Sequence, residues 1–177
     1  MSALRLGLLS TARINDEILA AANETDKVEI VAVGSRDSAR ADAYAAAHGI
    51  PRAHGSYEAL LTDPELDAVY ISLPNGLHHG STMQALAAGK HVLCEKPYSR
   101  HPEEVEAAFD AAEASGLVVM EAFMYRHHPQ TLLVERLVRE GALGRLLSIR
   151  ASFTFPLRNE TDVRARPDLD GGALMDV

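Results

Sequence analysis

The stretch LRLGLLSTARI, residues 4–14, begins as an apolar run and ends in a turn of small and polar residues. A continuous apolar run is typical of a strand buried on both faces of a sheet. Small residues in the turn after such a strand let the backbone approach a pyrophosphate at the N-terminus of the next helix. Ser10 and Ala12 stand where a dinucleotide-binding turn commonly has glycine, so the pattern also fits a turn without a ligand. The candidate cofactor-binding residues of this turn are Gly7, Ser10, Thr11, Ala12, Arg13 and Ile14.

The same alternation of an apolar run and an amphipathic stretch recurs along the chain. Further apolar runs lie at residues 28–33, 68–73, 91–94 and 117–120. The helical stretches between them end at glycines, as helices commonly do, namely at Gly49, Gly89 and Gly116. Strand and helix in regular succession predict an α/β fold, with a doubly wound parallel sheet over residues 1–122.

The pattern changes after Met120. A helical stretch at residues 129–138 precedes a run at residues 146–155 whose apolar residues alternate, as in an antiparallel strand with one covered face. These elements predict the start of an α+β substrate and oligomerisation domain at residues 123–177, which is cut off at Val177. A strand without neighbours invites pairing with another chain. We therefore expect residues 145–177 to be mobile or to join a homo-oligomer through this sheet.

The composition limits the partners of the protein. The 177 residues carry 17 Lys and Arg against 25 Asp and Glu, a net charge of −8, which opposes binding to nucleic acid or an anionic membrane. Cys94 is the single cysteine and cannot form an internal disulfide, and the apolar run at residues 6–9 is too short for a signal peptide or membrane span. His127 and His128 are adjacent, a spacing that does not suit one metal ion. We expect a soluble cytoplasmic protein with a small-molecule partner and no metal.

Gly34-Ser35-Arg36 follows the second apolar run, where the chain of a dinucleotide-binding domain meets the adenosine ribose. An Asp or Glu there would pair with the 2′-hydroxyl of NAD, whereas a small residue followed by Arg suits the 2′-phosphate of NADP. Ser35 and Arg36 fit the second pattern, and Arg40 lies one helical turn further on. The sequence favours NADP over NAD. Solvated arginines, or recruitment of Asp37, are the alternatives.

Two further apolar runs end in polar residues at the edge where open α/β sheets bind ligands. After the run at residues 68–73, Asn75 is placed to contact a cofactor ribose or a substrate, and it equally fits a helix N-cap. After the run at residues 91–94, Lys96 suits proton transfer to and from a carbinol, with a surface lysine before a proline as the alternative. The candidate residues at these two strand ends are Leu73, Pro74, Asn75, His78, Glu95, Lys96 and Pro97.

Five longer motifs occur in order along the chain. They are PNGLH (residues 74–78), AAGKHVLCEKP (87–97), EAFMYRHHP (121–129), GRL (144–146) and GGALMDV (171–177). In order and spacing these motifs resemble the glucose–fructose oxidoreductase / inositol dehydrogenase (Gfo/Idh/MocA) family, and most closely its NADP-using sugar and dihydrodiol dehydrogenases.

The resemblance implies a Rossmann-type cofactor domain in an oxidoreductase. Such an enzyme moves a hydride between NADP(H) and a secondary carbinol of a sugar, polyol or dihydrodiol. By this resemblance Lys96 polarises the substrate oxygen and passes its proton, Asp176 is its acidic partner, and the Lys96–Pro97 peptide is cis. Tyr125 and Arg126 match the segment that lines the substrate pocket.

The chain also departs from the family pattern. The turn at Ser10 and Ala12 is degenerate, and Gly80 stands where members often have Glu. Members also have a second catalytic residue, a His or Tyr about one helical turn after the position of Asp176. That residue has no place in a chain that ends at Val177. A catalytically inactive dinucleotide-binding sensor or interaction module is therefore the alternative function. A short-chain reductase is disfavoured because no Tyr-x-x-x-Lys pair occurs.

Overall fold

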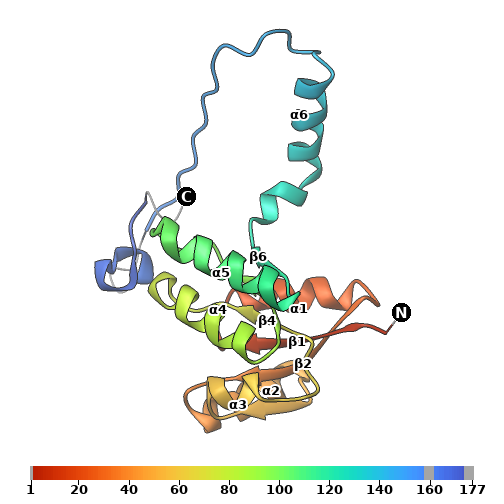
Figure 1. The fold of residues 1–177 in the computed structure, drawn as a ribbon, viewed down its shortest axis with the longest axis vertical. Coiled ribbons are helices and arrows are strands. Elements are labelled where there is room, and N and C mark those ends of the chain that lie inside the picture. Colours follow the sequence, from red (N-terminus) through yellow and green to blue (C-terminus); the bar gives the residue numbers. More distant parts are fainter. Residues whose placement is uncertain (1, 158–161, 174–177) are drawn as a thin grey trace.

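The computed structural model describes residues 2–157 and 162–173, and in this part of the chain six parallel strands form one sheet in the order β3-β2-β1-β4-β5-β6 (Figure 1). The strands are β1 (Leu4–Leu9), β2 (Val28–Gly34), β3 (Arg52–His54), β4 (Ala68–Ile71), β5 (His91–Cys94) and β6 (Val119–Glu121). The strand order reverses between β1 and β4, which flank the switch point of a doubly wound fold. The predicted α/β fold is confirmed.

Helices cover both faces of the sheet. The α-helices are α1 (Asn15–Asn23), α2 (Ser38–His48), α3 (Tyr57–Leu61), α4 (His78–Ala87), α5 (Pro102–Ser115) and α6 (Pro129–Arg139). The short 3-10 helices are η1 (Asn75–Leu77), η2 (Met124–His127), η3 (Val163–Ala165) and η4 (Pro167–Leu169). Side chains of α3, α4 and α5 pack in one buried cluster against the sheet, and those of α1 and α2 pack in a second cluster on the other face. Because both faces are covered, the inner strands are mainly apolar and carry their polar residues, such as Arg5 and His91, near their N-terminal ends.

Gly7 lies in the middle of β1, where the sheet meets the loop after α3. A Cβ at this position would lie 2.8 Å from Leu66 Cδ1 and 3.4 Å from Leu60 Cδ1. The glycine therefore lets two core leucines pack against the strand. Gly7 lies two residues before the carboxyl end of β1, and its expected contact with a cofactor stays a prediction.

Two short elements escaped the sequence analysis. They are β3, of three residues, and α3, of five. Ser56 caps α3 by accepting a hydrogen bond from the Ala59 N–H. Neither contains an apolar run or a helical repeat long enough to be recognised. The other helices end as expected, with Gly49 and Gly116 both at a φ of 68°.

The expected strand at residues 146–155 is not formed. After α6 the chain arches over and returns toward the domain as a segment without helix or strand (Figure 1). A strand requires backbone partners in a neighbouring strand, and no described segment supplies them. Leu147 and Ile149 are each 79% exposed as a result. The domain boundary at residue 122 stays a prediction.

None of the described helices is long and apolar enough to cross a membrane.

An ion pair joins the first strand to the loop before β4. Arg5 donates from its backbone N–H and its guanidinium to Asp67, with the shortest contact, Nη2 to Oδ1, at 2.7 Å. These hydrogen bonds and the nearby positive charge hold the pKa of Asp67 at about 2, below its ordinary value of 3.8. A carboxylate with a lowered pKa in the folded protein stabilises it above the unfolded pKa, and this stabilisation is lost as the pH falls toward the folded pKa.

We expect acidification from pH 4 to pH 2 to lower the free energy of unfolding by more in the native protein than in Asp67→Asn. The reason is that the variant has no carboxylate at this position to protonate. Urea unfolding of both proteins across this pH range measures the difference. Equal losses of unfolding free energy in the two proteins would contradict the lowered pKa of Asp67.

Candidate active site

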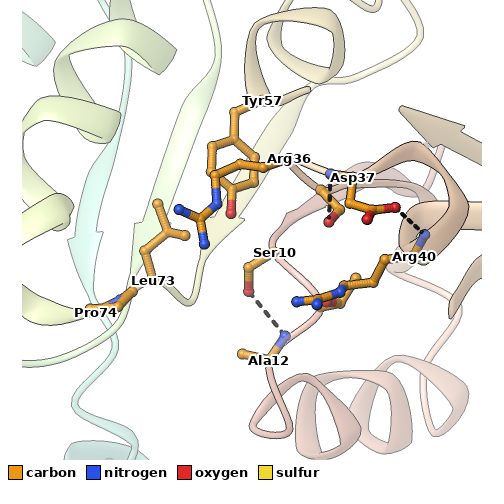
Figure 2. Close-up of a pocket in the computed structure, with 10 residues that line it drawn as sticks. Ser10, Ala12, Arg36, Asp37, Arg40, Tyr57, Leu73 and Pro74 are labelled. Carbon is orange, nitrogen blue, oxygen red and sulfur yellow. Dashed lines mark hydrogen bonds between the residues drawn. The ribbon is translucent and has the colours of Figure 1, made fainter. Parts of the chain in front are cut away.

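A cleft of about 420 Å³ opens at the carboxyl end of β1 and β4, at the switch point of the sheet (Figure 2). Open α/β sheets bind ligands at this place because the connections on either side of it diverge to opposite faces. The residues that line the cleft are Ser10, Thr11, Ala12, Ser35, Arg36, Asp37, Arg40, Tyr57, Leu73 and Pro74. Eight of these ten were predicted to bind the cofactor, Asp37 was the alternative partner, and Tyr57 was not anticipated.

Ser10 shapes the turn after β1. Its φ of 142° lies in the region that favours glycine, in agreement with the glycine expected there in a dinucleotide-binding turn. Its hydroxyl accepts a hydrogen bond from the Ala12 N–H at 3.1 Å and lies 2.7 Å from Ser72 Oγ. These contacts hold a non-glycine residue in a conformation that L-residues rarely adopt.

A buried network lies beneath this turn. Ser72 Oγ donates to Asn15 Oδ1 at 2.7 Å, and Asn15 Nδ2 donates to Ser10 O at 2.9 Å. Since the single Ser72 hydroxyl proton is used on Asn15, Ser10 must be the donor to Ser72. Asn15 is fully buried at the first position of α1. The network links the ends of β1 and β4 and fixes the turn against them. Asn15 and Ser72 were not anticipated from the sequence.

The turn places a helix N-terminus at one end of the cleft. Asn15 N–H donates to Ala12 O at 3.0 Å, so Thr11, Ala12, Arg13 and Ile14 form the tight approach to α1. A helix N-terminus favours a negatively charged group, because its first N–H groups lack partners within the helix and its dipole is positive there. This end of the cleft therefore suits a phosphate.

The end of β2 forms the opposite rim. Asp37 caps α2 by accepting a hydrogen bond from the Arg40 N–H at 2.9 Å, and Ser35 Oγ accepts one from the Asp37 N–H at 3.3 Å. Figure 2 shows the guanidinium groups of Arg36 and Arg40 directed into the cleft, with that of Arg36 beside the ring of Tyr57. Two cations and an aromatic ring thus share this rim, whereas the Asp37 carboxylate is engaged by the helix.

The loop after β4 supplies the third wall. Leu73 and Pro74 line the cleft. The Asn75 side chain donates to Asp170 O at 3.0 Å, and η1 has no side-chain cap, so the N-cap alternative for Asn75 does not hold. His78 is fully buried, with both ring nitrogens 2.7 Å from backbone carbonyl oxygens. The expected direct contact of His78 with a ligand does not fit this placement, because burial leaves no ring nitrogen facing the cleft.

Glu95, Lys96 and Pro97 follow β5 and are partly buried. The Lys96–Pro97 peptide is cis, as the resemblance implied. Glu95 Oε1 accepts a hydrogen bond from the Tyr70 hydroxyl at 2.6 Å, and burial raises the pKa of Tyr70. Glu95 Oε2 lies 3.3 Å from the Lys96 N–H, which donates to it. These three residues do not line the 420 Å³ cleft, and lie instead at the next strand end along the same edge of the sheet.

The remaining predicted residues lie further from the cleft. Tyr125 and Arg126 belong to η2, which follows β6, and Tyr125 is 58% exposed. Asp176 lies outside the described residues. The structure therefore brings together the cofactor candidates of three strand ends, but it does not place Tyr125 or Arg126 against them.

Replacing Tyr70 with Phe is expected to lower the free energy of unfolding by about 1.5 kcal/mol, because a hydrogen bond to a carboxylate is lost in a buried setting. Tyr44→Phe is the matched control. Its hydroxyl is buried and has no hydrogen-bond partner among the described residues, so we expect a much smaller change. Urea unfolding measures both variants, and equal losses would show that the Tyr70–Glu95 contact adds nothing specific.

Comparisons with known proteins agree with this geometry. Residues 4–123 match the family model described as "Oxidoreductase family, NAD-binding Rossmann fold". The chain is 47% identical over 175 residues to D-xylose 1-dehydrogenase (NADP(+)) 2 of Haloferax volcanii, with 98% of this chain and 54% of the relative covered. It is 36% identical over 178 residues to trans-1,2-dihydrobenzene-1,2-diol dehydrogenase of Xenopus laevis, with 99% of this chain and 53% of the relative covered.

The solved structure of KijD10, a 3-ketoreductase from Actinomadura kijaniata in complex with NADP and TDP-benzene, superposes with a TM-score of 0.90 at 39% identity. The superposition covers 99% of this chain and 54% of that chain. The present chain thus spans about half the length of the relatives it matches.

Proposed function

Because the chain belongs to the Gfo/Idh/MocA oxidoreductase family, with its NAD-binding Rossmann fold, we propose that it is a nicotinamide-dependent oxidoreductase. It moves a hydride between NADP(H) and a secondary carbinol of a sugar, polyol or dihydrodiol. The observation that carries this proposal is the cleft at the switch point, with a helix N-terminus at one end and Arg36 and Arg40 at the other. Such a cleft suits an elongated ligand that carries phosphates at two places.

The residues of the cleft fit NADP in three respects. The turn at residues 10–14 binds the pyrophosphate with the N-terminus of α1. Ser35, Arg36 and Arg40 hold the 2′-phosphate, while Asp37 is committed to capping α2 and so is a poor partner for the 2′-hydroxyl of NAD. Tyr57 and Leu73 offer apolar surface to the adenine.

The strand end at Glu95-Lys96-Pro97 carries the chemistry. When bound, the nicotinamide supplies the acceptor or donor of the hydride. Lys96 takes the hydroxyl proton when a carbinol is oxidised and returns it when a ketone is reduced. Glu95, anchored by Tyr70, borders the nicotinamide half of the site. Asp176 is the acidic partner of Lys96, and Tyr125 and Arg126 contact the substrate.

The substrate class follows from the relatives. One is a D-xylose dehydrogenase, one a dihydrodiol dehydrogenase, and others are reductases of a dTDP-linked keto sugar such as that of Streptomyces violaceoruber. All these names describe oxidation or reduction at a carbon that bears oxygen, which supports an enzyme over an inactive sensor or interaction module. A cytoplasmic location is part of the same proposal, and it agrees with a chain whose single cysteine, Cys94, is free and buried.

Titration calorimetry of the 177-residue chain with NADPH and NADH tests the cofactor. We expect tighter binding of NADPH, and binding of neither cofactor would overturn the proposal. Turnover is assayed with D-xylose and a trans-dihydrodiol, and also in a chimera whose remaining half comes from the D-xylose dehydrogenase, since the chain aligns with 54% of that relative. A chimera that binds NADPH without turnover would favour the sensor.

We also propose that the chain self-associates through the segment at residues 146–157. Its exposed apolar side chains, among them Ile149 and Phe153, gain by burial against a second copy. Light scattering over a range of concentrations is expected to give a mass near twice 19.1 kDa. The double variant Ile149→Lys/Phe153→Lys is expected to be monomeric, and a monomeric native chain would contradict the proposal.

A further inference from the structure

His78 lies at the first position of α4 and has no exposed surface. Its Nδ1 lies 2.7 Å from Pro97 O, and its Nε2 lies 2.7 Å from Leu73 O. One ring therefore bridges the loops that follow β4 and β5, which are separate strand ends of the sheet. Both bridged residues adjoin parts of the proposed site, since Leu73 lines the cleft and Pro97 follows Lys96.

We propose that His78 is a positioning residue that holds the cofactor-cleft loop and the Lys96 loop at a fixed separation. The effect of His78 on cofactor binding rests on the proposed function, whereas its two contacts come from the structure itself. His78 touches neither cofactor nor substrate, because it is fully buried and both of its polar atoms face backbone carbonyls. It acts through the two loops that it joins.

The two contacts are chemically separate links. A carbonyl oxygen can only accept, so the ring must donate at each nitrogen to form both hydrogen bonds. A ring that carries one proton makes only one of them, whereas a ring protonated at both nitrogens makes both. Each ring nitrogen lies 2.7 Å from a carbonyl oxygen, so each is placed to donate to its own loop when it carries a proton.

The surrounding contacts show why each loop depends on its link. On the Pro97 side, the Tyr98 N–H donates to Glu121 Oε1 at 2.8 Å, and the Tyr98 hydroxyl lies 3.1 Å from His79 Nδ1. On the Leu73 side, the Leu77 N–H donates back to Pro74 O within the same loop. The Asn75 side chain of that loop also donates to Asp170 O, and Ser72 before it donates to Asn15. Both loops thus have other ties, while the His78 ring is what joins them to one another.

Asparagine and glutamine separate the two links. The amide nitrogen of Asn stands close to the position of Nδ1 in His, and that of Gln stands close to the position of Nε2. His78→Asn therefore keeps the donor to Pro97 O and removes the donor to Leu73 O, and His78→Gln does the reverse. Both variants are neutral and of similar size, so a difference between them reports which loop has been released.

Hydrogen exchange of the chain without cofactor is the primary test. We expect His78→Asn to raise exchange several-fold in peptides covering residues 72–77, and His78→Gln to raise it several-fold in peptides covering residues 95–101. His48→Gln, an exposed histidine at the end of α2, is the control and should change neither region. Increased exchange throughout the sheet in both variants, or no change in either loop, would overturn the proposal.

Cofactor binding gives the second readout. His78→Asn is expected to weaken NADPH binding several-fold, because Leu73 and Pro74 line the cleft, whereas His78→Gln should leave the Kd near that of the native chain. If NADPH fails to bind the native chain, the proposed function fails while the exchange experiment still decides the role of His78.

Nitrogen-15 NMR of the native histidine keeps the inference testable even where a variant does not fold. We expect a ring N–H of His78 that exchanges slowly with solvent, because the ring is buried and both of its nitrogens face carbonyl oxygens. A ring N–H that exchanges as fast as that of an exposed histidine would overturn the proposal.

Discussion

Lys96→Met is expected to lower turnover by about 10²- to 10⁴-fold and to leave the Kd of NADPH nearly unchanged, because general acid–base groups contribute rate factors of this size. Met matches the length and apolar stem of Lys but cannot donate or accept a proton. Lys96 lies at the β5 end and outside the lining of the cofactor cleft, so its loss removes proton transfer rather than cofactor contacts. A fall in turnover without a change in cofactor affinity separates a proton-handling role from a binding role.

Initial rates and NADPH titrations of the native and variant proteins make this measurement, with the chimera used if the 177-residue chain has no turnover. Lys27→Met is the matched control, since Lys27 is an exposed lysine before β2. It should keep native rates. If Lys96→Met retains full turnover, the catalytic assignment is wrong and Lys96 is a lysine of the loop only.

Arg36→Ala is expected to weaken NADPH binding by about 10- to 100-fold, which corresponds to the roughly 1.5 to 3 kcal/mol of a hydrogen bond to a charged group. NADH should bind the variant as it binds the native chain, because it has no 2′-phosphate for the guanidinium to contact. Arg36 stands at the rim of the cleft with its guanidinium directed inward beside Tyr57 (Figure 2). The preference for NADPH should therefore largely disappear.

Calorimetric titration of both cofactors into the native chain and the variant measures this preference. Arg136→Ala changes an exposed arginine of α6, outside the cleft, and serves as the control for net charge. A lower ionic strength should enlarge the difference between native chain and Arg36→Ala, since salt screens contacts between charges. Equal native affinities for NADPH and NADH would contradict the proposed role of Arg36.

Much of the fold was predictable because the relevant information is local. The bounds of the predicted runs at residues 4–9 and 91–94 are those of β1 and β5, since the buried part of a strand covered on both faces is a continuous apolar run. The glycines at 49 and 116 ended helices as expected, because a left-handed residue at that position costs least for glycine. The ends of β1, β2 and β4 place Ser10, Ser35 and Leu73 around one cleft.

The tertiary structure alone decided which polar side chains are partners. Asn15 and Ser72 are 57 residues apart, and His78 joins carbonyls that lie 5 residues before it and 19 after it. Similarly, Tyr57 reaches the cleft from α3, a helix of five residues that no periodicity marks. The prediction of a strand at residues 146–155 was wrong, because no described segment lies beside these residues to pair with them. Apolar periodicity is written in neighbouring residues, whereas a hydrogen bond or a strand pairing needs a partner whose position depends on how distant elements pack.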